Sequence, residues 1–319
     1  MTRWTFILAA AGALAAAGPA TANLTITPTF GGSITSDLNA AAIEATINSA
    51  ILTYEHLFTN PIDVAITFQE GGGLGGSSFS LFDISYSAFS TALYNNAHTT
   101  MNATQLAAVA ANPISLFNPV TGTNDILMKC ANIDALFGNG ASGCASAGTI
   151  TLNTSLTTPG SPGSASQYSL LTVVEHEIDE ILGLGSTLGL GLSGQTCGFS
   201  PNTGPCTNVP SPEDLFRYAS DGTRSFTTAT TNAYFSIDGT TDLAQFNNTN
   251  NGADYGDWKS GAVPQMQDGF ATQGATPTLG PAEIAALTAI GYNVPEPGTY
   301  AVFAIGVAGL LRLRRRQRA

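Results

Sequence analysis

The chain has 319 residues, of which 43% are hydrophobic and only 10% are charged. Six of its ten basic side chains lie in two short end segments, so residues 23–293 keep four basic side chains against 21 acidic ones, a net charge of about −17. So acidic a surface repels nucleic acid and anionic lipid. We therefore expect no nucleic-acid partner.

The first end segment has the order of a secretory signal. Arg3 precedes an apolar run at residues 6–17, and the small residues 20–22 offer a site for signal peptidase. The run is too short for a stable membrane span. We predict a signal peptide at residues 1–22; the alternative, a buried first helix of the mature domain, is weaker because the run lacks a polar face.

Residues 23–293 are enough for a domain with a large hydrophobic core. Apolar residues at every third or fourth position predict an amphipathic helix over residues 37–58, and residues 64–68 alternate as in a half-buried strand. Residues 71–76 predict a glycine-rich loop, and no Lys-Ser or Lys-Thr follows it as in a phosphate-binding loop. The other expected elements are helices at 87–96, 103–111 and 281–290 and a strand at 149–152.

Four cysteines in an exported chain favour two disulfides. Their spacing favours the local pairs Cys130–Cys144 and Cys197–Cys206, although the sequence leaves the two other connectivities open. Metal ligation by these thiols is the weaker alternative, because no C-x-x-C spacing is present.

Residues 170–186, LLTVVEHEIDEILGLGS, carry the most informative pattern. Their apolar residues fall on one face of a predicted helix, which Gly183 is well placed to end. On that helix His176 and Glu180 are four positions apart and point the same way, while Glu177 lies about 100° round the axis. A metal held by His176 and Glu180 would have the Glu177 carboxylate beside it, as zinc-assisted hydrolysis needs.

This segment resembles the zincin active-site motif H-E-x-x-H and its metzincin extension H-E-x-x-H-x-x-G-x-x-H. His176, Glu177 and Gly183 match, whereas Glu180 replaces the second histidine and Ser186 replaces the third metzincin ligand. A carboxylate oxygen can bind zinc, but a serine hydroxyl is a poor ligand, so no ligand role passes to Ser186. The resemblance implies zinc as cofactor, with His176 and Glu180 as ligands and Glu177 as the catalytic base.

Four downstream segments extend the likeness to a group of metalloproteases with a PEP-CTERM tail and an H-E-x-x-[HE] helix; they are residues 212–218, 235–239, 254–258 and 289–292. The resemblance implies an α+β, zincin-like domain with an active-site helix packed on a mixed sheet and a loop-rich C-terminal part. It also implies a secreted or surface-sorted zinc metallopeptidase that acts on a protein or peptide substrate. The alternative is a non-catalytic extracellular matrix or surface protein with a degenerate zincin fold, in which His176 is a solvated residue on an acidic helix face.

A catalytic zinc needs a third protein ligand. Asp214 and Glu213 are the candidates, because they lie downstream of the helix as the carboxylate ligand does in gluzincins, and Asp214 is the one preferred. Its alternative role is structural, since Ser211 and Asp214 also fit the capping box of a short helix. His56 and His98 are expected at the surface, and Met266 is either core or a weak likeness to the metzincin methionine turn.

A structural calcium ion is a second cofactor hypothesis. Residues 238–257 are rich in Asp, Asn and Gly and offer hard oxygen ligands on turns. Turn formation explains the same composition equally well.

The C-terminal end segment has three parts: a Pro-Glu-Pro triplet at 295–297, an apolar stretch at 300–313 and an arginine cluster at 314–318. A short apolar helix with a basic end predicts a membrane stop, for which a simple anchor is the alternative. The order resembles the PEP-CTERM sorting domain, which implies processing by an exosortase, transient inner-membrane anchoring by a short transmembrane helix, and delivery to the surface or exterior of a Gram-negative bacterium. The expected division of the chain is a signal peptide at 1–22, a zincin-like catalytic domain at 23–293 and a sorting tail at 294–319.

Overall fold

The computed structural model describes residues 23–160, 164–198, 203–220, 222–229 and 232–295. The predicted signal peptide and nearly all of the predicted sorting tail lie outside the described residues. No helix within the described ranges is long and apolar enough to cross a membrane.

A four-stranded mixed sheet forms the first half of the domain. Its order is β1 (Thr25–Phe30), β2 (Asp63–Glu70), β6 (Gly148–Leu152) and β3 (Gly75–Phe79). The first three strands run parallel, and the edge strand β3 runs antiparallel to β6. Val64, Ile66 and Phe68 of β2 are buried while their neighbours are partly exposed, which confirms the predicted alternation and leaves one apolar face for helices.

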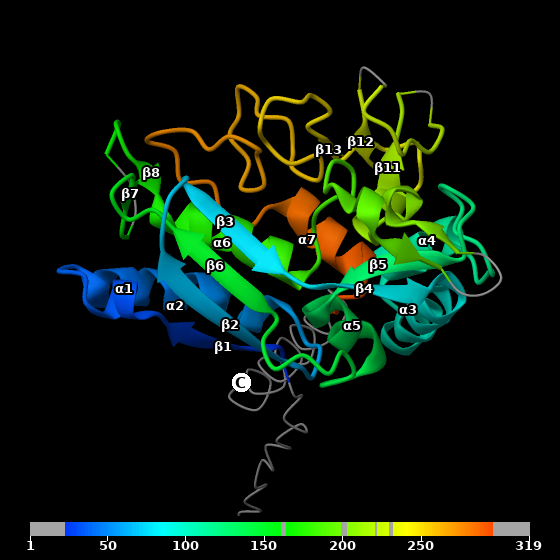
Figure 1. Ribbon diagram of the computed structural model, residues 1–319, viewed down its shortest axis with the longest axis horizontal. Helices are drawn as coiled ribbons and strands as arrows, with labels where there is room; N and C mark the ends of the chain where they lie inside the picture. Colours follow the sequence, from blue (N-terminus) through cyan, green and yellow to red (C-terminus); the bar gives the residue numbers. More distant parts are fainter. Residues whose placement is uncertain (1–22, 161–163, 199–202, 221, 230–231, 296–319) are drawn as a thin grey trace, which may run out of the picture.

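Helices α2 (Ala40–Leu57) and α6 (Leu170–Leu182) pack against this sheet and against each other (Figure 1). The buried residues of α2 follow the helical spacing predicted over residues 37–58, and the short helix α1 (Gly32–Thr35) precedes it. The Tyr54 hydroxyl of α2 donates a 2.7 Å hydrogen bond to the backbone carbonyl of Glu175 in α6. This bond fixes the two helices relative to each other.

The second half contains an antiparallel pair, β4 (Leu81–Ser85) and β5 (Asp125–Lys129), with helices α3 (Tyr86–Thr100), α4 (Ala103–Ala111) and α5 (Cys130–Phe137). α4 has the predicted bounds, whereas α3 continues past residue 96 until Met101, which adopts a left-handed φ of 56°. The prediction of a loop over residues 71–76 is wrong at its end, because Gly75 and Gly76 pair with β6 as the start of β3.

After α6 the chain is mostly loops until the last helix. This region contains the short 3-10 helices η1 (Leu192–Gly194), η2 (Cys206–Asn208) and η3 (Glu213–Phe216), the two-residue strands β9 (Thr196–Cys197), β10 (Gly204–Pro205), β11 (Arg217–Tyr218), β12 (Tyr234–Phe235) and β13 (Ala244–Gln245), and the helix α7 (Pro281–Ala289). Two further short strands, β7 (Thr157–Thr158) and β8 (Tyr168–Ser169), come before α6. Figure 1 shows the loops on one side of the molecule, next to α6 and α7. Phe235, Phe246 and Trp258 of this region pack ring to ring.

This mixture of helices and small sheets confirms the α+β expectation. The cysteines form the two predicted disulfides, Cys130–Cys144 and Cys197–Cys206.

Candidate metal centre

Both ends of α6 are held in place by local contacts. The Ser169 side chain accepts a hydrogen bond from the backbone N–H of Thr172, and Gly183 ends the helix with a φ of 136°. At that end the buried Lys129 ammonium donates to the backbone carbonyls of Glu180 at 2.7 Å and Leu184 at 2.6 Å. A cation at a helix C-terminus stabilises the carbonyls that have no partner within the helix.

Three side chains that can bind a metal converge beside this helix. The Nε2 atom of His176 lies 3.7 Å from Oε1 of Glu180 and 3.6 Å from Oδ1 of Asp257. One ligand atom from each of the three residues lies within 4.8 Å of the others. Two ligands bound tetrahedrally to zinc at bond lengths of roughly 2.0–2.1 Å are about 3.4 Å apart. Small side-chain movements would therefore give three of the four corners of a zinc site.

Backbone and side-chain contacts orient these ligands. Nδ1 of His176 lies 3.2 Å from the Met266 carbonyl, and donation of the Nδ1 proton to it directs the Nε2 lone pair toward the carboxylates. The Ser77 hydroxyl donates to Glu180, and the Gln267 amide donates to Asp257 at 3.2 Å. The same amide lies 3.5 Å from His176 Nε2, a contact that a bound ion would replace.

An open pocket of about 250 Å³ lies over this cluster. No lysine or arginine is among the described residues that line it. Its lining acids are Glu177, Glu180, Asp254, Asp257 and Asp268. So many neighbouring carboxylates repel one another unless protons or a cation neutralise them.

The protonation behaviour of the cluster reflects this crowding. Burial raises the pKa of Glu177 well above its usual value, and the charge of Glu180 raises it further. Burial also raises the pKa of Asp257 to about 7, against the opposing effect of His176. Burial disfavours a charged His176, but the surrounding carboxylates outweigh it and raise the pKa of His176 to about 10. The carboxylates of this cluster therefore stabilise a positive charge among them, such as the proton on His176.

Glu177 lies beside the three candidate ligands and is not one of them. It is only 5% exposed, and its Oε2 is buried without a hydrogen-bond partner among the described residues. The backbone of Gly75 in β3 approaches so closely that a Cβ there would collide with the Glu177 carboxylate and with Val173. The glycine at position 75 therefore makes room for a carboxylate that faces the pocket.

Asp214 is not brought to this cluster. Its carboxylate accepts hydrogen bonds from Ser186 Oγ at 2.5 Å, the Thr187 backbone at 3.0 Å and the Ser211 backbone at 2.9 Å. The Ser211 hydroxyl in turn accepts from the Asp214 backbone, so the two residues form the capping box that was the structural alternative. The acid from the region after α6 that lies beside His176 is Asp257.

Asp257 reaches the site because its loop packs directly on the end of α6. Gly256 touches the backbone of Gly185 and Ser186 so closely that a Cβ would not fit. Trp258 is fully buried and its Nε1 donates to Glu283 at 3.0 Å. The sequence signal that could have identified Asp257 is its position between Gly256 and Trp258. The glycine allows close approach to α6, and the tryptophan anchors the loop.

The remaining candidates lie elsewhere. His56 and His98 are exposed, as expected. Met266 is buried and lines the pocket, and it contacts His176 through its backbone carbonyl.

Comparison with known proteins bears on the C-terminal end of the chain. Residues 293–316 match the PEP-CTERM protein-sorting motif. This motif marks export and sorting to the cell surface in Gram-negative bacteria, with processing by an exosortase. No curated protein and no solved structure matches the chain.

Proposed function

We propose that this protein is a surface-sorted zinc metallopeptidase that hydrolyses peptide bonds. His176, Glu180 and Asp257 would hold the zinc ion, and Glu177 would serve as the general base. The observation that carries the proposal is the convergence of these three ligands in an open pocket, with a buried carboxylate beside them.

The donor set fits zinc. One imidazole nitrogen and two carboxylate oxygens are ligands that zinc accepts, and three protein ligands leave the fourth position open, as in catalytic sites. A zinc ion held there would supply Lewis acidity that polarises a substrate carbonyl and activates water. The packing of α6 on a mixed sheet supports the zincin-like part of the proposal.

Glu177 would carry out the proton transfers of the reaction. As general base it would take a proton from the attacking water and return it to the amine that leaves when the C–N bond breaks. Burial raises its pKa, and the positive charge of a zinc ion beside it would act in the opposite direction and favour the carboxylate that takes the proton.

A peptide is the substrate class that the pocket supports best. β3 is an edge strand of the sheet, and residues 74–77 line the pocket. An extended peptide can pair its backbone with such an edge and so lie across the pocket.

The test measures zinc content and peptide cleavage by the purified mature protein. We expect stoichiometric zinc and cleavage of a peptide library detected by mass spectrometry. Glu177→Gln should keep the zinc but lower kcat by about 10²- to 10⁴-fold, the usual contribution of a general base. Glu44→Gln on α2, away from the pocket, is the matched control. Wild-type protein that stays free of zinc after zinc-supplemented expression and cleaves no peptide would rule the proposal out.

A further inference from the structure

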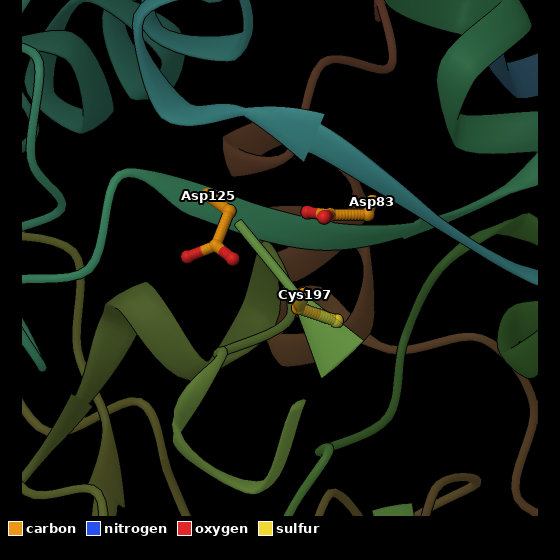
Figure 2. Close-up of side chains that lie close together, drawn as sticks. All are labelled: Asp83, Asp125 and Cys197. Atoms are coloured by element: carbon orange, nitrogen blue, oxygen red, sulfur yellow. The ribbon is translucent and has the colours of Figure 1, made fainter. Parts of the chain in front are cut away.

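A second acidic cluster lies on the β4–β5 pair, away from α6. Asp83 is opposite Leu127, and Asp125 is opposite Ser85, so the two acids are diagonal neighbours on the same face of the ribbon. Figure 2 shows the Asp83 carboxylate pointing toward Asp125, with Cys197 beside them. One atom from each of Asp83, Asp125 and Cys197 lies within 4.8 Å of the others.

Neither carboxylate is neutralised by its surroundings. Asp125 is only 2% exposed, and its Oδ1 is buried without a hydrogen-bond partner among the residues that the structure describes. The Oδ1 atom of Asp83 is also buried and has no hydrogen-bond partner in the described part of the chain, while its Oδ2 accepts a 2.7 Å hydrogen bond from the Gly198 backbone. Within the described part of the chain, neither acid forms an ion pair with Lys, Arg or His.

Asp125 is buried and Asp83 is half-buried, and like charges this close to each other are costly unless something neutralises them. Burial raises the pKa of Asp83, and the charge of Asp125 raises it further, although the Gly198 hydrogen bond acts in the opposite direction. A fixed positive charge between the two oxygens that lack partners would remove this cost.

We propose that Asp83 and Asp125 bind a divalent cation of the calcium type, which ties β4 and β5 to residues 197–198 beside the Cys197–Cys206 disulfide. The cation must be one that prefers hard oxygen ligands, because the sulfur of Cys197 is already bonded to Cys206 and offers no thiolate. This site is independent of the proposed peptidase centre.

A pocket on the Asp125 side of the cluster would give the ion a path from solvent. A pocket of about 280 Å³ reaches Asp125 and Cys197 and is also lined by Thr203 and Asn208. Calcium takes six to eight oxygen ligands and accepts waters among them. The two carboxylates would supply the protein ligands, and waters in this pocket would complete the coordination.

The site joins segments that are far apart in the sequence. Gly198 donates to Asp83, and the Leu127 backbone donates to the Pro210 carbonyl at 3.0 Å. Pro210 immediately precedes the capping box of Ser211 and Asp214. The cation would thus hold the segment that follows the disulfide loop against β5.

The experiment follows the melting temperature of the mature protein after chelation and readdition of calcium chloride. Extracellular calcium sites bind with Kd values of about 10⁻⁴–10⁻³ M. At ten times the Kd, ligand linkage should raise the Tm by roughly 3 to 6 °C for a domain of this size. Isothermal titration with calcium chloride should give a single binding event in the same concentration range.

Matched variants locate the binding. Asp83→Asn and Asp125→Asn should abolish the calcium-dependent shift in Tm. In the presence of chelator each variant should melt no lower than wild type, because the repulsion between the two carboxylates is gone.

Asp238→Asn is the control, since Asp238 is an exposed acid whose Oδ1 already accepts hydrogen bonds from the Thr240 and Thr241 backbones at 2.8 and 2.7 Å. It also lies in the Asp-rich segment that the sequence suggested for calcium. The shift should persist in Asp238→Asn, and also in Glu180→Ala, which separates it from the peptidase centre.

Two results would overturn the proposal. One is a wild-type protein whose Tm and titration heat do not respond to 10 mM calcium, which is what two carboxylates sharing one proton would give. The other is a calcium shift that survives the Asp83→Asn/Asp125→Asn double substitution.

Discussion

Asp214 and Asp257 are both buried aspartates that follow the same helix, but their hydrogen bonds differ. Asp214 accepts from five donors, two of them on Ser211. Asp257 accepts one amide hydrogen bond from Gln267 and a long one of 3.3 Å from the Asp254 backbone, and it faces His176 across an open pocket. A carboxylate whose lone pairs are filled by donors holds a loop together, whereas one with spare lone pairs next to an imidazole is available to a metal.

The largest expected effect separates these two aspartates. Asp257→Asn should lower zinc affinity by more than the roughly 10- to 100-fold that loss of an outer-shell contact costs, and peptidase activity should fall with it. Asp214→Asn should keep zinc and activity but lose about 1–3 kcal/mol of stability, because an amide N–H₂ would face backbone donors. Zinc titration and denaturant unfolding of both variants measure the contrast. Equal zinc affinity in the two variants would contradict it.

Glu180 can be tested in the same way. Its carboxylate accepts a hydrogen bond from Ser77, and it is also a proposed zinc ligand. Glu180→Ala should lose zinc, since a site with three protein ligands cannot spare one. Glu180→His should retain zinc, because it places the commoner ligand at the same position four residues after His176. If Glu180 only accepted a hydrogen bond, the two variants would bind the same amount of zinc.

The part of the site on α6 could be predicted from sequence because it depends only on local geometry. A separation of four residues places His176 and Glu180 on the same side of any α-helix, and Gly183 ends that helix whatever surrounds it. The helices and the strand with regular apolar spacing were predictable for the same reason.

The rest depends on contacts between distant segments. β3 begins with two glycines and so lacks the alternation that marks a strand; it exists because it pairs with β6. Asp257 reaches His176 only because Gly256 and Trp258 fit their loop against other parts of the fold. Asp214 was the sequence candidate because chain order shows that an acid follows the helix but not which donors surround it.

Glu213, next to Asp214, gives a prediction about pH. Its pKa is raised to about 8, chiefly by burial and also by the charge of Asp214, against the opposing effect of the Gly185 backbone N–H. Because the folded-state pKa lies above the usual value near 4.5, the folded state binds the extra proton, and stability falls as the pH rises from about 5 to about 8. Each pH unit in this window should cost up to about 1.4 kcal/mol.

Glu213→Gln should remove that part of the pH dependence, since glutamine can accept the same Gly185 hydrogen bond without ionising. Unfolding in urea at pH 5, 6.5 and 8 measures the free energy of unfolding of both proteins. The difference between them cancels the other titrating groups, and Glu44→Gln serves as the control. Parallel pH profiles for Glu213→Gln and wild type would mean that Glu213 is ionised in the folded protein.

The smallest expected effect concerns the orientation of a ligand. Ser77 donates its hydroxyl to Glu180 from β3, and outer-shell contacts of this kind usually change metal affinity by 10- to 100-fold. Ser77→Ala should therefore weaken zinc binding by about tenfold, the low end of that range, because Glu180 stays in place on its helix and loses only one donor. Ser78→Ala is the matched control, since Ser78 is the next residue of the strand, is exposed, and points to the opposite face of the sheet. A competition assay with a zinc chelator resolves a tenfold change, and equal affinities in Ser77→Ala and Ser78→Ala would mean that the Glu180 carboxylate is oriented by its helix alone.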